Sequence, residues 1–76
     1  MRSRDEHLAW ARKRALEYVD TGQLHLALVS LSSDLTKHED TSADQEARAR
    51  VLDATRRLAE GRMDAAALRA WIECFR

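Results

Sequence analysis

Helix-breaking residues are nearly absent from this chain, and their positions divide it into helical segments. Its 76 residues include no proline and two glycines, Gly22 and Gly61. Proline and glycine are the residues least compatible with a helix interior, whereas a glycine just past a helix end readily adopts the left-handed conformation found there. On both sides of each glycine, apolar residues recur every three or four positions, the spacing of one helix face. The sequence therefore predicts an all-α fold.

Start and stop signals predict four helices, spanning residues 4–21, 23–38, 43–60 and 65–75. Ser3 with Glu6, and Ser42 with Gln45, match the capping box that begins a helix, and Asp64 is a further cap signal. A chain of this length has room for one domain. We expect a small bundle of three to four helices, built from two helical hairpins in an up-and-down arrangement.

Each predicted helix has an apolar stripe that we expect to face the core. In chain order the stripes are Leu8, Ala11, Ala15, Leu16, Tyr18 and Val19; Leu24, Ala27, Leu28, Leu31 and Leu35; Ala43, Ala47, Val51, Ala54 and Leu58; and Leu68, Trp71, Ile72 and Phe75. The second helix also has a neutral facet on its far side, formed by Leu26, Val29, Ser30 and Ser33. We therefore expect this helix to be covered on two sides.

Trp10 does not belong to the apolar stripe of its helix. At about 100 degrees per residue it lies roughly 200 degrees from Leu8, among charged side chains. An exposed tryptophan ringed by polar groups is typical of an interface hot spot. The alternative is that the third or fourth helix folds over this face and buries the ring. Trp10, Leu26 and Val29 are the predicted partner-binding residues, for a host or phage protein or for a second copy of the chain.

The charge of the chain is balanced, with 13 basic and 13 acidic residues. No strong field therefore attracts nucleic acid or an anionic membrane. The arginine-rich helix 43–60 is the best nucleic-acid candidate, with Arg48, Arg56 and Arg57 as its predicted contacts. Because Asp53 lies four residues before Arg57, the favourable order for an ion pair within a helix, we expect part of this basic surface to be neutralised.

Residue types that bind metals or perform catalysis are few and scattered. His7, His25, His38 and Cys74 lack the paired spacings of zinc sites. Asp34 lies four residues before His38, and a helix-end salt bridge is the expected role of that carboxylate, since no nucleophile or oxyanion donor is evident beside it. We expect no enzyme activity, no cofactor and no metal.

The chain has no apolar segment of the kind that a signal peptide or a membrane span requires. Its single cysteine, Cys74, has no second cysteine with which to form an internal disulfide. Both features favour a cytoplasmic protein without membrane contact.

The first half of the chain resembles short hypothetical proteins of actinobacterial phages and prophages. The resemblance covers residues 5–41 and rests on His7-Leu8-Ala9-Trp10, Arg14-Ala15-Leu16-Glu17-Tyr18, Gly22, Ser33-Asp34-Leu35 and Lys37-His38. It implies a phage or prophage setting and supplies no functional residue. In their spacing, Tyr18, Gly22 and Ala27 also resemble a single tetratricopeptide unit, which implies a helical hairpin; a solenoid needs several stacked units.

These features predict a non-enzymatic protein–protein interaction module. We expect a phage or prophage accessory protein that acts on a host or viral protein or associates with itself. The alternative is a small DNA-binding regulator that uses the arginine-rich helix 43–60.

Overall fold

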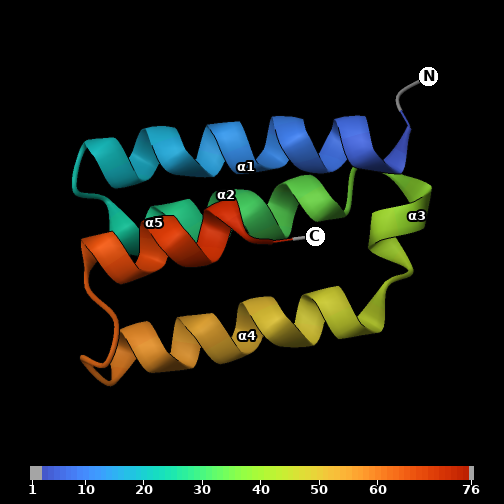
Figure 1. Cartoon of the computed structure of the whole chain (residues 1–76). Coiled ribbons are helices and arrows are strands. Elements are labelled where there is room, and N and C mark those ends of the chain that lie inside the picture. The colour runs from blue at the N-terminus through green and yellow to red at the C-terminus, as the bar shows by residue number, and fades with distance from the viewer. Residues whose placement is uncertain (1–2, 76) are drawn as a thin grey trace.

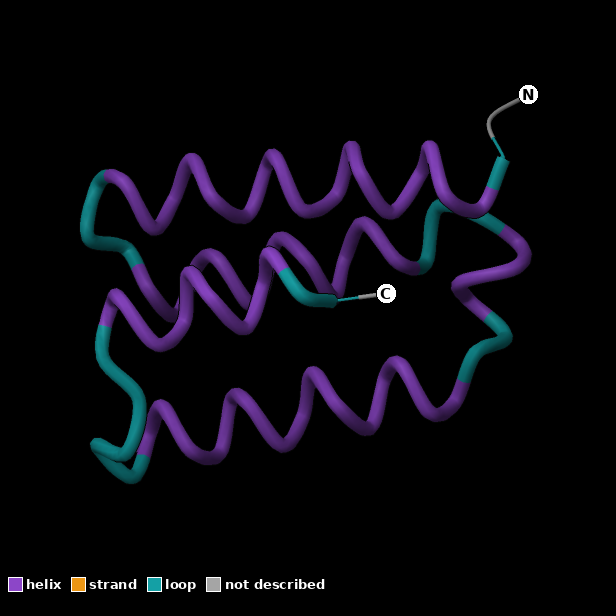
Figure 2. The backbone as a smooth tube through the Cα atoms, in the orientation of Figure 1, coloured by secondary structure: helices purple, strands orange, loops and turns teal. Residues whose placement is uncertain are grey.

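Four long helices run alternately up and down the molecule, and a single helical turn joins its two halves (Figure 1). The computed structural model describes residues 3–75, and of Asp40 the backbone alone. The helices are α1 (Arg4–Asp20), α2 (Leu24–Leu35), α3 (Glu39–Ser42), α4 (Gln45–Ala59) and α5 (Ala65–Glu73). Short loops join them, and the described residues contain no strand (Figure 2). The predicted all-α bundle is confirmed.

The helices α1 and α2 form the central pair of the bundle. α1 packs on α2 and on α5, while α2 also packs on α4. Each of these pairs runs antiparallel (Figure 1), as short connections between helices favour. α2 thus has a neighbouring helix on two sides, α1 and α4. The neutral facet that was expected to be the second covered side is not covered by either helix, because its residues Leu26, Val29 and Ser33 are exposed.

Two glycine turns of the same geometry end α1 and α4. Gly22 (φ 77°) and Gly61 (φ 73°) adopt the left-handed conformation. In each turn the glycine N–H bonds to the carbonyl three residues earlier, and the next residue's N–H bonds to the carbonyl five residues before it. This Schellman motif satisfies two carbonyls that the helix end leaves without partners. Any side chain at either glycine would be strained by the positive φ.

α1 and α5 begin at the capping residues that the sequence predicts, Ser3 and Asp64. The Ser3 hydroxyl accepts the N–H of Glu6 at 3.2 Å, and the Glu6 carboxylate accepts the N–H of Ser3 in return, which completes the capping box. The Asp64 carboxylate accepts the N–H of Ala67 at 2.8 Å. Each cap satisfies N–H groups that lack a partner within the helix.

The predicted capping box of Ser42 with Gln45 is wrong. α4 is capped by Asp44, whose carboxylate accepts the N–H of Ala47 at 3.0 Å. The same carboxylate receives the Arg4 guanidinium at 2.9 Å. Asp44 therefore links the start of α4 to the start of α1, a contact across 40 residues of sequence that local patterns do not reveal.

α2 ends at Leu35, three residues earlier than predicted. The hydroxyl of the buried Thr41 donates to the Leu35 carbonyl at 2.5 Å and approaches the His38 carbonyl at 3.2 Å. The Leu35 carbonyl thus accepts a side-chain hydroxyl in place of the backbone N–H that a further turn of α2 would supply. The residues between the predicted helices 23–38 and 43–60 are not an irregular loop, because they belong to α3, which turns the chain toward α4.

The hydrophobic core follows the predicted stripes closely. It comprises Leu8, Ala11, Ala15, Val19, Ala27, Leu28, Leu31, Leu35, Ala47, Val51, Ala54, Leu58, Met63, Leu68, Ile72 and Phe75. The predicted core residues Leu16, Tyr18, Leu24 and Trp71 are half-buried and pack at its edge. Ala43 is exposed, because it precedes α4.

A buried carboxylate fastens α1 to the end of α2. Asp34 is 1% exposed; its Oδ2 accepts Arg14 Nε at 2.8 Å, and its Oδ1 accepts Lys37 Nζ at 3.1 Å. Its backbone carbonyl accepts the Nε2–H of the buried His7 at 2.5 Å. A buried charge is tolerated only when it is paired in this way. The spacing of Asp34 and His38 predicts a salt bridge between these two residues at the helix end, but the structure pairs Asp34 with Lys37 and Arg14 instead.

Replacement of Ser30 tests how tightly the α2 helix is enclosed. Its hydroxyl is the buried side-chain oxygen that lacks a hydrogen-bond partner among the described residues. We expect Ser30→Ala to raise the free energy of unfolding by about 1 kcal/mol, because it removes an unsatisfied polar group and improves helix propensity. Ser33→Ala, at an exposed position of the same helix, controls for propensity in urea denaturation. A Ser30→Ala variant no more stable than Ser33→Ala would contradict this description of the core.

The pH dependence of stability tests the Asp44 cap. The Ala47 N–H, and after it the Arg4 guanidinium, hold the pKa of Asp44 below its ordinary value of 3.8. A lowered pKa in the folded state stabilises the protein above the unfolded pKa, and this contribution is lost as the pH falls through the folded pKa. We expect Asp44→Asn to be less stable than the natural chain at pH 7, with a difference that disappears in acid.

Asp64→Asn at the cap of α5 is the matched control for the Asp44 experiment. Asn is as good a capping residue as Asp, so both variants keep their caps. Asp44→Asn also loses the ion pair with Arg4, and we therefore expect the larger loss of stability from it. Equal losses would show that the link between α1 and α4 contributes nothing.

Candidate functional site

A shallow groove runs between the outer sides of α2 and α4. Its volume is about 480 Å³, and it is lined by Leu28, Val29, Ser32, Ser33, Thr36, Val51, Leu52 and Thr55. None of these side chains is charged. The antiparallel packing of α2 on α4 places both walls, and short side chains at the rim of α2 keep the groove open.

Leu26, Val29 and Leu52 are the exposed large hydrophobic residues in the part of the chain that the structure describes. Their exposed fractions are 46%, 60% and 70%. Leu26 and Val29 lie three residues apart on α2, so they share one face. Leu52 comes from α4 and lines the groove together with Val29. We call these three residues and the groove the α2–α4 surface.

Two of these residues, Leu26 and Val29, are among the predicted partner-binding residues, and the structure shows that both are exposed. The third, Leu52, was not predicted. Leu26 and Val29 lie together on the neutral outer facet of α2, but Ser30, assigned to the same facet, is buried. Leu52 was missed because it follows the core residue Val51 and looks like an extension of that stripe. The signal that identifies it is its position between Arg48 and Arg56, each four residues away on a charged face of α4.

Trp10 lies in a different place and is half-buried. Its ring centroid is 5.3 Å from that of His7, 4.9 Å from the guanidinium carbon of Arg14 and 5.7 Å from Nζ of Lys37. Such cation–π contacts stabilise the folded state. The ring therefore lies against α1 side chains and against Lys37, just beyond the end of α2. It is not brought together with Leu26 and Val29.

Two of the four arginines of α4, Arg56 and Arg57, are engaged by acidic neighbours. Arg56 binds Asp53 at 2.6 Å and Glu60 at 3.0 Å, and the predicted pair of Arg57 with Asp53 forms at 3.9 Å. The hydrogen bond from Arg56 holds the pKa of the Asp53 carboxyl below its ordinary value. Arg48 is exposed. Most of the predicted nucleic-acid contacts are thus neutralised within their own helix.

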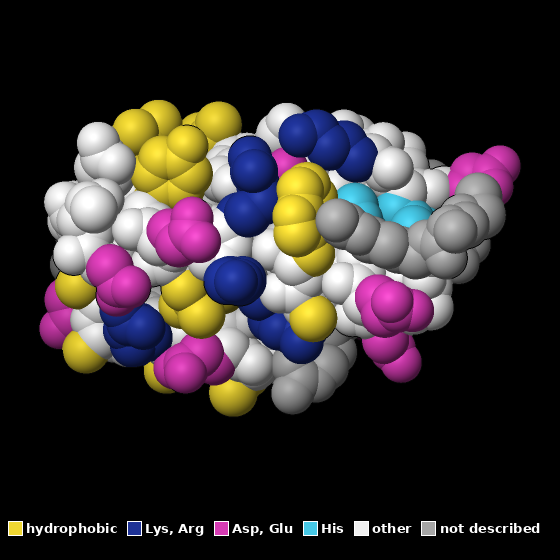
Figure 3. All heavy atoms as spheres, turned by 90° about the horizontal axis from the view of Figure 1, so that it is seen from above, with side chains coloured by type: hydrophobic (Ala, Val, Ile, Leu, Met, Phe, Trp, Pro, Cys, Tyr) yellow, Lys and Arg dark blue, Asp and Glu magenta, His cyan; other side chains and the backbone are white. Residues whose placement is uncertain are grey.

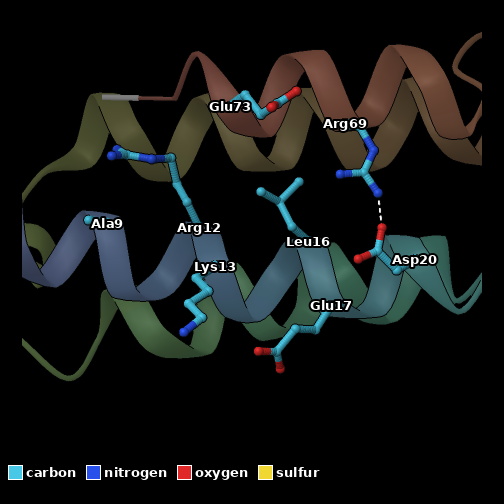
Figure 4. A pocket seen from close by; sticks show the side chains of 8 residues that line it. All are labelled: Ala9, Arg12, Lys13, Leu16, Glu17, Asp20, Arg69 and Glu73. Carbon is cyan, nitrogen blue, oxygen red and sulfur yellow. Dashed lines mark hydrogen bonds and ion pairs between the residues drawn. The ribbon is translucent and has the colours of Figure 1, made fainter.

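A second groove, of about 550 Å³, runs between α1 and α5 (Figure 4). Leu16 points toward α5 at its centre, and the side chains around it carry charges of both signs. Arg69 and Asp20 form an ion pair across the groove. Basic and acidic side chains are likewise interspersed on the face viewed from above (Figure 3). Six of the eight residues that line this groove are charged, whereas small-molecule sites are lined mainly by hydrophobic and aromatic residues.

Two further kinds of site are not found in residues 3–75. Among the side chains that the structure describes, which exclude that of Asp40, no three His, Cys, Asp or Glu gather as a metal site built wholly from protein ligands would require. Within the same residues, no helix has both the length and the apolar character needed to cross a bilayer.

No protein-family model, curated protein or solved structure matches the chain. The likeness of residues 5–41 to short phage and prophage proteins, and that of the first hairpin to a tetratricopeptide unit, therefore remain predictions from the sequence. α1 and α2 do form an antiparallel hairpin around Gly22. The function of the protein has to be inferred from its surfaces.

A comparison of two truncations tests which apolar residues the fold needs. Trp10 is enclosed by His7, Arg14 and Lys37, so we expect Trp10→Ala to lower the free energy of unfolding by about 1–2 kcal/mol. We expect Leu52→Ala to change it by less than about 0.5 kcal/mol, because the side chain is mostly in water. Urea denaturation of dilute protein measures both. Similar losses from the two variants would show that Leu52 belongs to the core.

Proposed function

We propose that this protein is a non-enzymatic interaction module that binds another protein through the α2–α4 surface. The observation that carries the proposal is the position of the exposed large hydrophobic side chains. Leu26, Val29 and Leu52 all lie on α2 or α4, beside an uncharged groove. Contiguous apolar surface of this kind on a small protein marks an interaction site more often than scattered single residues do.

The shape and chemistry of the surface suit a helical or extended partner segment. The groove is open along its length, and its walls offer methyl groups from Val29, Val51 and Leu52 together with hydroxyl groups from α2. An amphipathic helix can lay an apolar face into such a groove. The guanidinium of Arg56 pairs with the carboxylates of Asp53 and Glu60. A partner can therefore cover this part of the surface without burying an unpaired charge.

The exposed residues of this surface, Leu26, Val29 and Leu52, lie outside the hydrophobic core, which leaves them free for binding. The cores of α2 and α4 are formed by other residues, among them Leu31, Leu35 and Ala54, which are fully enclosed. In contrast, Trp10 takes part in the contacts that hold α1 to α2. We therefore assign binding to Leu26, Val29 and Leu52 and a structural role to Trp10. The resemblance of the first hairpin to phage and prophage proteins favours an accessory protein of a phage or prophage.

Site-specific photocross-linking tests the proposed surface. A benzophenone amino acid replaces Leu52 in one variant and Ala66, an exposed residue of α5, in a control variant. We expect irradiation of cells that express the Leu52 variant to give a discrete protein adduct, and the Ala66 variant to give none. We also expect the adduct to disappear when Val29→Lys is introduced into the same chain, because a lysine there places an ammonium group in the groove.

The mass of the adduct identifies the class of partner. A cross-linked species of twice the 8.7 kDa chain is a second copy, and any other mass is a foreign protein. Equal labelling from position 66, or an adduct that survives Val29→Lys, would overturn the assignment of binding to the α2–α4 surface.

A further inference from the structure

We infer that His7 and His38 together bind a divalent transition-metal ion of the zinc type, at one end of the α1–α2 pair. This inference goes beyond the proposed function, because neither histidine lies on the α2–α4 surface. The centroids of the two rings are 5.1 Å apart, and the ring planes are inclined at 39°. His7 lies on α1, whereas His38 lies between α2 and α3. The sequence predicts no metal site because these residues are distant along the chain, and the fold brings them together.

The separation of the two rings is the one that a shared metal ion requires. Zinc binds an imidazole nitrogen at about 2.0–2.1 Å, and the centre of the ring lies about 1.1 Å beyond that nitrogen. Two imidazoles on one tetrahedral ion therefore have centroids about 5 Å apart. The observed separation of 5.1 Å agrees with this value.

The hydrogen bond of His7 determines which of its nitrogens can bind a metal. Nε2 lies 2.5 Å from the backbone carbonyl oxygen of Asp34. Because a carbonyl can only accept, Nε2 carries the proton and Nδ1 carries the lone pair of the neutral ring. Histidines that bind metals commonly donate their other ring N–H to a backbone carbonyl, which fixes the tautomer and the orientation of the ring. His7 is therefore held in the form that a metal ion needs.

The histidine pair can be reached from solvent. His7 is 4% exposed, but His38 is half-buried. Histidine side chains also reach the surface of the face viewed from above (Figure 3). An ion can thus approach along the ring of His38 and bind next to the enclosed ring of His7.

The surroundings of the pair limit how tightly an ion is held. Arg14 and Lys37 lie 4.9 and 5.7 Å from the centroid of the neighbouring Trp10 ring, and the buried Asp34 carboxylate offsets part of their positive charge. The two histidines are also fewer than the three or four protein ligands of typical zinc sites, so water has to complete the coordination. We therefore expect weak, reversible binding.

Calorimetric titration of the purified full chain with Zn²⁺ tests the site. A Cys74→Ser background removes the exposed thiol, which could itself bind the ion. We expect one ion to bind per chain and His38→Gln to weaken binding at least tenfold. His25→Gln removes an exposed histidine at the far end of α2, and we expect no change from it. Urea denaturation without metal checks that both variants are folded. No binding to the background chain, or equal binding by the two variants, overturns the inference and leaves the proposed function untouched.

Paramagnetic Cu²⁺ locates the bound ion by its effect on the two indole N–H resonances of the same background chain. The Trp10 ring lies 5.3 Å from that of His7, whereas Trp71 contacts Phe75 on the C-terminal side of α5. We expect copper to broaden the Trp10 signal before that of Trp71, and His38→Gln to abolish this difference. Simultaneous broadening of both signals in the background chain, or selective broadening of Trp10 that persists in His38→Gln, overturns the inference by placing the ion elsewhere.

Discussion

The burial of a nearly uncharged helix is the constraint on which the rest of this structure depends. α2 carries Asp34 as its one formal charge and packs on α1 and on α4. Because α1 also packs on α5, the α1–α2 pair joins all four long helices. The cations of Arg14 and Lys37, with the ring of His7, hold that pair together around the buried Asp34 carboxylate. The third side of α2 is left without cover in the described chain.

The helices and their stripes were predictable from the sequence because they depend on local chemistry. Gly22 and Gly61 end helices through bonds within five residues, and the apolar periodicity selects the core. The start of α4 and the end of α2 were not predictable, because both depend on contacts between residues that are not neighbours within one helix. Asp44, the cap of α4, forms an ion pair with Arg4, and the hydroxyl of Thr41 donates to the Leu35 carbonyl at the end of α2. Leu52 could not be assigned to a binding surface until the packing of α4 on α2 showed which of its sides faces solvent.

The polar clusters and the apolar surface of this protein have different roles. The groups around Asp34, the ring of Trp10 and the ion pairs of α4 satisfy one another within the chain, so they account for stability. Leu26 and Val29 find no such cover and contribute little to folding. Exposed apolar residues that neighbour one another in this way are typical of an interaction site.

Methyl resonances followed while the partner captured at position 52 is added test most directly whether α2 and α4 form the binding surface. We expect the methyl signals of Leu26, Val29 and Leu52 to shift as the complex forms, because these groups enter the interface. The signals of Leu31 and Leu68, which are fully buried in the free chain, should stay constant. Shifts confined to residues of α5, or methyl signals of Val29 and Leu52 that do not change while the complex forms, would contradict the assignment.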